Sequence, residues 1–442
     1  MALTKATNRM IVGASANVED FGAVGDGSTD DTSAFQACAD SLYSTGGVLY
    51  IPKGTYKLTA TINVPDAVLV NGEGNDTVLS FYSSAMLHGI SFYGGSWSPP
   101  ITSNVRVGVS NLRIDGSNVV WSTFVPALGA VRFYIVRTAI CENVNVENWQ
   151  GTGFMLDSSA DITIQNCYVY RSYEHSLYLS GHYGSPGDPL TDEGGHKLIN
   201  NTIVESGYAS GTSHIGIKMA NDVRNALVQG NFIVNSTNQA IIAESTVDCS
   251  ILNNTIKDSA SYGIRLLSTV AGPIVISNNT LIGSTSEEIR VLGGSGHLIS
   301  NNFFKPSAGQ WAIVASQIND SSIIGNLFDG LFGIDINGTS ANNFVSGNNF
   351  INGPQTVGIR TNASTLNNIV TGNSSTAVSN GGTRNVFRNK FESEGAAAPV
   401  AGTWAHGDIV WDTAPAAGVT VGWVCTAAGT PGTWKSFGTI AT

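Results

Sequence analysis

Proton-transferring side chains are concentrated between residues 173 and 214 of this 442-residue chain. Four of the seven histidines and four of the thirteen tyrosines fall in this stretch, and a lysine, Lys218, follows it. Neutral imidazoles and phenols exchange protons near neutral pH, and an ammonium group stabilises negative charge that develops on a substrate. These residue types therefore suit acid–base chemistry on an anionic substrate.

This stretch interrupts a regular repeat. Phrases such as "INNTIV", "ILNNTI" and "ISNNTLI" place an Asn before an x-aliphatic pair, and successive Asn residues mostly lie 22 to 25 residues apart. The spacing grows to 35 residues from Asn166 to Asn201, and to 30 residues from Asn201 to Asn231. Long loops on neighbouring repeats emerge side by side, so we expect the inserted residues to wall a groove.

Each repeat has room for two or three short strands, but not for the longer runs of a helical repeat. Alternating segments such as "SLYLS", "IGIKM" and "YGIRLL" supply strands whose aliphatic side chains point inward. An Asn at a corner tolerates left-handed backbone and can hydrogen-bond to the neighbouring repeat. The pattern predicts an all-β, single-stranded parallel β-helix, which is a solenoid with one turn per repeat.

Composition narrows the classes of partner. The chain is 42% hydrophobic and 12% charged, with a net charge of −11, and this acidity argues against binding to nucleic acid. No apolar stretch reaches 18 residues, so we expect no membrane insertion, and the start "MALTKATNRMIVGASA" lacks the apolar core of a signal peptide. The five scattered cysteines have no metal-binding spacing and are expected to be small buried hydrophobic residues.

The two ends of the chain carry different signatures. "STDDT" precedes an amphipathic run, which predicts a helix over the open end of the solenoid, with Asp26, Asp30 and Asp31 in turns and helix capping. After the linker "EGAAAPVAG", four of the eight tryptophans lie among strand-sized pieces. We therefore divide the chain into a lead-in (1–16), a capping helix with the first strands (17–100), a β-helix with groove-forming loops (101–394) and a small Trp-rich β module (395–442).

The segment "DFGAVGDGSTDDTSAFQ…GGVLYIPKGTY" resembles the N-terminal signature of the pectate-lyase-like right-handed parallel β-helix family, especially its bacteriophage tailspike and polysaccharide depolymerase members. The resemblance implies a right-handed β-helix, usually a homotrimer, that binds and often cleaves a bacterial surface polysaccharide. It also implies attachment to a phage tail or an adaptor protein, and action outside the cell from the virion tail. It transfers no catalytic residues, because "HIGIKM" only partly matches the NTD…DD…GHG…RIK set of the polygalacturonase branch.

Strand alternation indicates which candidates share a face. With the aliphatic pairs inward, an outward column contains Asp157, Ser180, Lys218 and Glu244, with Tyr178 and His214 beside it. The candidate catalytic residues are Asp157, Tyr178, His182, His214, Lys218 and Glu244. The candidate substrate-binding residues are Trp121, Arg171, Tyr173, Glu174, His175, Tyr183 and Tyr208.

Two reactions compete for these residues. Glycoside hydrolysis needs two carboxyl groups within about 5–9.5 Å, whereas Asp157 and Glu244 lie three repeats apart, so a loop carboxylate would have to take part. β-Elimination on a uronic acid needs a cation, a base and an acid, and the mixture of Lys, His and Tyr favours this lyase reaction. A uronate epimerase and a non-catalytic receptor-binding spike remain alternatives. We expect no cofactor; Ca²⁺ in the loop "GDPLTDEGG" is a weaker alternative, because the loop lacks regular ligand spacing.

Overall fold

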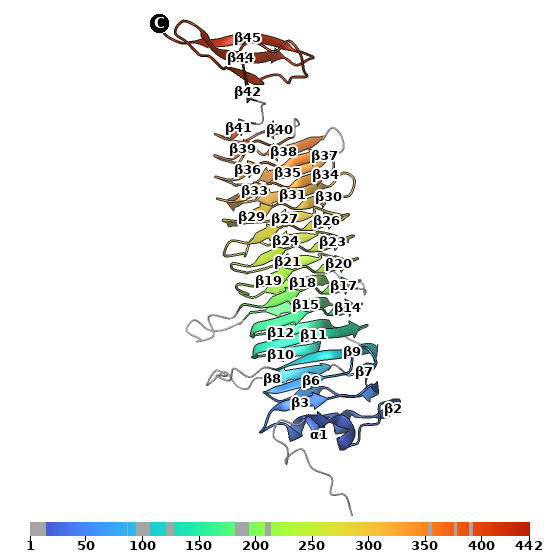
Figure 1. Cartoon of the computed structure of the whole chain (residues 1–442). Helices are drawn as coiled ribbons and strands as arrows, with labels where there is room; N and C mark the ends of the chain where they lie inside the picture. The colour runs from blue at the N-terminus through green and yellow to red at the C-terminus, as the bar shows by residue number, and fades with distance from the viewer. Residues whose placement is uncertain are drawn as a thin grey trace, which may run out of the picture.

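The strands of the chain stack into a long solenoid with helix α1 (Thr32–Ser41) at one end and a small separate sheet beyond the other (Figure 1). This computed structural model describes residues 15–85, 87–93, 107–120, 128–181, 194–207, 214–351, 356–374, 378–388 and 392–442. We call one turn of the solenoid a rung. Within the described residues, strand pairs along the solenoid are parallel, which confirms the predicted parallel β-helix.

One face of the solenoid is a single parallel sheet, which we call sheet B. Its described strands, in spatial and chain order, are β5 (Ile62–Val64), β8 (Ile90–Tyr93), β10 (Gly129–Tyr134), β12 (Thr152–Asp157), β15 (His175–Ser180), β18 (Ile215–Ala220), β21 (Ile241–Ala243), β24 (Ile264–Leu266), β27 (Ile289–Val291), β31 (Trp311–Ser316), β35 (Phe332–Asn337), β38 (Val357–Thr361) and β40 (Val378–Asn380).

The remaining faces belong to a second sheet, which we call sheet A. Its described strands are β1 (Ala16–Asn17), β2 (Asp26–Asp30), β3 (Gly47–Tyr50), β4 (Gly54–Leu58), β6 (Val68–Asn71), β7 (Thr77–Ser83), β9 (Val107–Val119), β11 (Arg137–Glu147), β13 (Ala160–Gln165), β14 (Tyr168–Tyr170), β16 (Lys197–Ile199), β17 (Thr202–Val204), β19 (Leu227–Gln229), β20 (Phe232–Val234), β22 (Ser250–Leu252), β23 (Thr255–Lys257), β25 (Val275–Ser277), β26 (Thr280–Ile282), β29 (Leu298–Ser300), β30 (Phe303–Lys305), β33 (Ser322–Ile324), β34 (Leu327–Asp329), β36 (Phe344–Ser346), β37 (Asn349–Ile351), β39 (Ile369–Thr371) and β41 (Val386–Arg388). A short pair, β28 (Gly294–Ser295) and β32 (Ile318–Asn319), lies at a corner.

Aliphatic side chains fill the inside of every rung. Leu177, Ile217 and Ile241 are register partners on successive strands of sheet B, and each is fully buried. Burying one such side chain contributes about 1.5–3 kcal/mol relative to leaving it exposed. The same inward position recurs on each rung, so the core is a set of stacked columns, and these columns fix the register between rungs.

A ladder of buried asparagines lines one corner of the solenoid. Asn231 donates from its backbone N–H and from Nδ2 to Oδ1 of Asn254, at 2.9 Å in each case. Asn254 makes the same pair of bonds to Asn279. The ladder confirms that corner asparagines bond to the neighbouring rung, and its members are Asn201, Asn231, Asn254, Asn279, Asn302, Asn326, Asn348 and Asn373.

The first two asparagines of the predicted repeat do not belong to this ladder. Asn143 and Asn166 have φ values of 54° and 53°, so they occupy the left-handed turn position. Cys167 holds the ladder position on the Asn166 rung, and its backbone N–H donates to Oδ1 of Asn201 at 3.0 Å. The sequence phrase therefore contains two different asparagine positions, one in the left-handed turn and one in the buried ladder.

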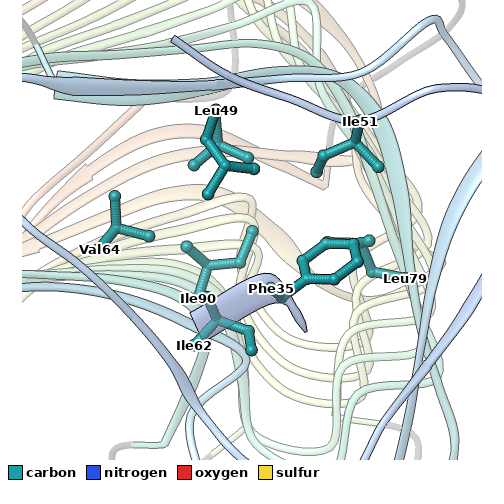
Figure 2. A pocket seen from close by; sticks show the side chains of 8 residues that line it. Phe35, Leu49, Ile51, Ile62, Val64, Leu79 and Ile90 are labelled. Carbon is teal, nitrogen blue, oxygen red and sulfur yellow. The ribbon is translucent and has the colours of Figure 1, made fainter. Parts of the chain in front are cut away.

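Helix α1 closes the N-terminal end of the solenoid. Phe35 points from the helix into the first rungs, where Leu49, Ile51 and Ile62 surround it (Figure 2). Asp26 and Asp30 accept hydrogen bonds from the backbone of Thr29 and of Thr32, as the turn and capping prediction requires. Asp31 differs, because its carboxylate accepts from the backbone N–H groups of Val24 and Gly25 and so holds the preceding loop rather than the helix.

The C-terminal segment forms a sheet separate from the solenoid, with strands β42 (Glu392–Gly395), β43 (Ile409–Asp412), β44 (Thr420–Ala427) and β45 (Thr433–Thr439). Trp404 and Trp434 pack edge to face at 5.1 Å, and Trp411 packs likewise on Phe437 at 5.4 Å.

All five cysteines of the chain are buried thiols, as predicted. Within the described residues, the helical segments are too short or too polar to traverse a lipid bilayer.

Candidate active site on sheet B

The outward positions of sheet B form two parallel columns of side chains. In the first, Tyr178 lies opposite Met155 on one side and Lys218 on the other. We call it the central column; its members are Arg132, Met155, Tyr178, Lys218, Ile242, Arg265 and Arg290. The second, which we call the flanking column, contains Tyr93, Tyr134, Asp157, Ser180 and Ala220.

The predicted column is wrong for Lys218. The register partner of Ser180 is Ala220, whereas Lys218 lies opposite Tyr178. The reason is that Leu177 and Leu179 align with Ile217 and Met219, two residues further along β18 than the pair used for the prediction. Asp157 and Ser180 are register partners, as predicted. Glu244 directly follows Ala243, the partner of Met219, so it extends the flanking column past Ala220.

Tyr178 lies at the centre of a polar cluster. The Lys218 ammonium is 5.6 Å from the centroid of the Tyr178 ring, and Lys218 Nζ lies 3.7 Å from a carboxylate oxygen of Glu244. Asn221 Nδ2 lies 3.4 Å from the Tyr178 hydroxyl and donates to Ser180 Oγ at 2.9 Å. The side chains of Lys218 and Glu244 remain 24% and 38% exposed, so a ligand can reach the cation.

The surroundings of Tyr178 hold its phenol in the neutral form. Burial raises the pKa of Tyr178, and the nearby carboxylates Asp157, Glu174 and Glu244 raise it further. A hydrogen bond with Ser180 acts in the opposite direction. A neutral phenol beside a cation is a proton donor, so Tyr178 is suited to act as a general acid.

A buried imidazole packs against this phenol. The ring centroids of His175 and Tyr178 are 5.4 Å apart, and His175 is only 3% exposed. Burial lowers the pKa of His175 to about 3, and the charges of Lys218 and His214 act in the same sense. His175 is therefore a neutral imidazole at pH 7. Its Nε2 lies 3.7 Å from a carboxylate oxygen of Glu174.

His214 and Tyr173 lie at the corner where the chain enters sheet B. Their rings meet edge to face at 5.6 Å, and His214 is 4% exposed. Burial lowers the pKa of His214, while Glu174 and the backbone of Tyr173 oppose that shift. Glu174 is also buried and accepts a hydrogen bond from Thr152 Oγ1 at 3.1 Å. The structure thus joins Glu174 and His214 to His175, the imidazole that packs on Tyr178, and Tyr173 contacts His214 in turn.

Other predicted site residues are not part of this cluster. Arg171 follows β14 of sheet A, where its Nε lies 2.7 Å from Glu205 and its guanidinium lies over the Tyr170 ring at 4.9 Å. Asp157 contacts Arg132, with 3.5 Å between Oδ2 and a guanidinium nitrogen. The candidates Trp121, His182, Tyr183 and Tyr208 lie outside the described residues.

The carboxylates of the flanking column do not have the spacing of a hydrolase pair. Asp157 and Glu244 lie three rungs apart, which corresponds to about 14 Å at the usual strand spacing. Inverting and retaining glycosidases need about 6.5–9.5 Å and about 5–5.5 Å, respectively. In the described part of the chain, no three or more His, Cys, Asp and Glu side chains are grouped to hold a metal ion.

Two polar side chains on or beside the outer face of sheet B, Arg132 and Asn221, escaped the sequence prediction. Arg132 lies in the central column, and aligning "AVRFY" with "SLYLS" and "GIKMA" by their inward pairs would have found it. Asn221 lies in a turn with a φ of 57°, and sequence alone gave no signal that its amide reaches Tyr178.

Two family models match this chain. Residues 15–265 match the family described as "Rhamnogalacturonase A/epimerase, pectate lyase-like". The chain belongs to this family. Residues 239–391 match a second family model, "Right handed beta helix region", so the solenoid is right-handed as the resemblance implied.

Proteins similar to this chain include two carbohydrate-active enzymes and a phage tailspike. The chain is 24% identical over 233 residues to mannuronan C5-epimerase AlgE5 of Azotobacter vinelandii, a match that covers 46% of this chain and 22% of that protein. The catalytic unit of a GH87 α-1,3-glucanase from Streptomyces thermodiastaticus has a similar fold, with a TM-score of 0.63, 16% identity and coverage of 85% and 69% of the two chains. Tailspike protein 3 of bacteriophage CBA120 gives a TM-score of 0.60, with 13% identity and coverage of 97% and 70%. The chain spans only about a fifth of the length of the epimerase relative.

Proposed function

We propose that this protein depolymerises an acidic bacterial polysaccharide by β-elimination at a uronic acid residue. The observation that carries the proposal is the contact of Tyr178 with both Lys218 and His175 on the outer face of sheet B. It joins a reachable cation, a neutral phenol and a neutral imidazole. The kinship with a mannuronan C5-epimerase, which by its name acts at C5 of a polyuronate, supports the same substrate class.

The proposed reaction uses each group once. Lys218 binds the uronate carboxylate and stabilises the negative charge that spreads into it when the C5–H bond breaks. The proton from C5 passes to a neutral imidazole of the cluster, His175 or His214. The electrons of that bond form the C4–C5 double bond, the bond from C4 to the glycosidic oxygen breaks, and Tyr178 protonates the departing oxygen. The products are a new reducing end and an unsaturated uronate.

Lys218 is available for this role despite its contact with Glu244. A partly exposed ion pair at 3.7 Å contributes only about 0–1 kcal/mol. A substrate carboxylate can therefore replace Glu244 as the partner of the ammonium at little cost. We expect Lys218→Ala and His214→Ala each to lower activity at least tenfold with the fold preserved, and near-normal rates in both would contradict this site.

Epimerisation is the second candidate, because the named activity of AlgE5 is C5-epimerisation. It begins with the same loss of the C5 proton and ends when a proton returns to the opposite face of the ring, so the glycosidic bond survives. The cluster around Tyr178 could serve either outcome. A hydrolase, favoured by the fold of the α-1,3-glucanase, would need a carboxylate pair that the flanking column does not supply.

We further propose that the protein is a tailspike-like component of a phage tail and assembles as a homotrimer. Support comes from the N-terminal signature and from the shared fold with tailspike protein 3. Light scattering of the purified chain tests the trimer; a monomer at micromolar concentration would contradict it. Immunogold labelling of virions with an antibody to the chain tests the location.

The function is tested by incubation with a panel of polyuronates and neutral glucans in D₂O. Near-ultraviolet absorbance, reducing ends and deuterium at C5 are followed together. Rising absorbance with new reducing ends is the expected result. Reducing ends without absorbance would indicate a hydrolase, and deuterium at C5 without cleavage would indicate an epimerase. Binding without any of these signals would indicate a receptor-binding spike.

A further inference from the structure

Two tyrosines form a stacked pair on sheet B, away from the cluster around Tyr178. Tyr93 ends β8 and Tyr134 ends β10, and the two are register partners in the flanking column. Their ring centroids are 5.5 Å apart and their planes differ by 21°. Tyr93 is 52% exposed, which makes it the most exposed aromatic side chain among the described residues of sheet B.

Contacts on its inner side hold this pair in place. The guanidinium of Arg132 lies over the Tyr134 ring at 4.4 Å and reaches Asp157 at 3.5 Å. Within the described residues, Arg132 Nε is buried and has no hydrogen-bond partner. Tyr134 is therefore contacted by the Tyr93 ring and by the Arg132 guanidinium, whose Nε–H makes no hydrogen bond within the described residues. Tyr93 stacks on the ring that Arg132 contacts and remains half exposed.

The pair is aligned with the candidate active site. From Tyr93 and Tyr134 the flanking column continues to Asp157 and Ser180, and Ser180 is on the same strand as Tyr178. Tyr134 is two rungs from that strand and Tyr93 three, or about 10 and 14 Å at the usual spacing. A pyranose ring is about as long as the spacing between rungs, and Lys218 lies one rung beyond Tyr178. A sugar chain bound along sheet B from Lys218 would therefore reach Tyr134 after about three residues and Tyr93 after about four.

We propose that Tyr93 and Tyr134 form a distal sugar-binding subsite, which stacks a pyranose ring of the acidic polysaccharide with Arg132 as the adjacent cation. This inference rests on the proposed function. Aromatic faces bind the apolar C–H face of a sugar, while the phenol hydroxyl remains available for hydrogen bonds. Because the pair is already ordered, little conformational entropy is lost on binding.

A purely structural role makes a different prediction. Cross-strand aromatic pairs stabilise a sheet by about 0.2–1 kcal/mol whether or not a ligand is present. Removal of a structural ring would change the melting temperature but not the affinity for sugar. Removal of a subsite ring would weaken the binding of long chains and leave short chains, which do not reach it, unaffected.

The test compares Tyr93→Ala, Tyr93→Phe and the control Tyr168→Ala, which disrupts the stacked Tyr168–Tyr170 pair on sheet A. For Tyr93→Ala we expect KM for the polyuronate most rapidly cleaved in the panel to rise about threefold to tenfold, with KM for its trimer unchanged. Tyr93→Phe keeps the stacking ring and should raise this KM less than Tyr93→Ala does, whereas Tyr168→Ala should behave like the unmodified protein. Equal KM values for the long substrate in Tyr93→Ala and the unmodified protein would overturn the inference.

A binding measurement separates this inference from the proposed function. Affinity electrophoresis in gels that contain each polyuronate measures retention without any need for turnover. If Tyr93→Ala loses retention while no chain is cleaved, the subsite stands and the lyase proposal fails. If cleavage proceeds and Tyr93→Ala is retained as strongly as the unmodified protein, only the subsite proposal is contradicted, and the lyase proposal stands. Failure of every polyuronate to be retained would overturn both.

Discussion

At the residue scale, Tyr178 differs from the other half-buried tyrosines of the solenoid in what surrounds it. A cation, an imidazole and an amide contact its ring or hydroxyl, and three carboxylates help to keep it protonated. Each contact alone is common on a protein surface. Their convergence on one phenol with a raised pKa is the arrangement expected of a group that donates a proton during catalysis.

Tyr178→Phe tests this role directly, because it keeps the ring contacts with Lys218 and His175 and removes only the hydroxyl. We expect cleavage of the polyuronate to slow by about 10²-fold or more, the usual contribution of a general acid. Initial rates by absorbance provide the measurement, with circular dichroism to verify the fold. Tyr168→Phe on sheet A is the matched control, and a full rate in Tyr178→Phe would exclude the phenol as the acid.

A second titratable residue, Glu288, affects stability rather than catalysis. It is fully buried just before β27, where Ser284 Oγ donates to its carboxylate at 2.6 Å. Burial raises the pKa of Glu288 to about 7, against the hydrogen bonds from Ser284. The folded protein therefore binds this proton more tightly than the unfolded chain, whose pKa is 4.5. The contribution to stability is fully present below pH 4.5 and is lost as pH rises through 7.

The expected loss for Glu288 is about 3 kcal/mol between pH 4.5 and pH 8. Urea unfolding of the native chain and of Glu288→Gln across this range measures it as a difference, because the amide does not titrate. Buried histidines with lowered pKa values, such as His175 and His196, act in the opposite sense and cancel in that comparison. Parallel stability curves for the two proteins would contradict the assignment.

At the element scale, the asparagine ladder is what ties one rung to the next at its corner. Asn279 accepts from the backbone N–H and Nδ2 of Asn254, and its own amide donates to Ile251 O at 2.9 Å and Asn302 Oδ1 at 3.0 Å. All these partners are buried, so none can turn to water instead. The ladder thus satisfies polar groups that the tight corner would otherwise leave unpaired.

Asn279→Ala should therefore destabilise the solenoid by about 3 kcal/mol, because it leaves the buried N–H groups of Asn254 without their acceptor. Urea unfolding followed by circular dichroism measures the change. Asn118→Ala, at an exposed position of β9, is the control and should change stability by less than about 0.5 kcal/mol. Equal values for the two variants would show that the ladder amides do not contribute as described.

At this scale, the sequence predicted which face of a strand a side chain occupies better than it predicted the register between neighbouring strands. The two-residue period of strands showed that Lys218 and Tyr178 point outward, but not that they lie opposite each other. The long loops between Asn166 and Asn231 break the regular spacing of the repeat. The register between the strands on either side of them therefore depends on which buried aliphatic side chains pack together, and the local sequence does not show this. Asn143 and Asn166 show the same limit, since the phrase around a ladder asparagine also fits the left-handed position one residue earlier.

At the scale of the whole molecule, the candidate site lies on the side of the solenoid and not at its end. Sheet B continues from β12 back to β5 on one side of Tyr178 and from β18 to β40 on the other (Figure 1). A polymer laid along this sheet can extend past the site in both directions. The geometry favours attack within a chain over attack at its terminus.

The expected consequence is a rapid fall in the viscosity of a polyuronate solution while few new ends have formed. Capillary viscometry and absorbance on the same sample measure the two quantities. An enzyme that removes one unit from chain ends would instead release small products while the viscosity stays nearly constant. Size-exclusion chromatography of early products is the second measurement, and a predominance of dimers at that stage would contradict the prediction.

The ladder also bears on how such chains change over evolutionary time. Each bond that a ladder asparagine makes to another rung reaches an adjacent rung, and the inward columns repeat the same contacts. A rung added by in-frame tandem duplication could therefore make the same ladder hydrogen bonds and core contacts with the rungs on both sides of it. Descendants could lengthen or shorten sheet B in whole rungs while inheriting the same N-terminal closure and the same cluster around Tyr178.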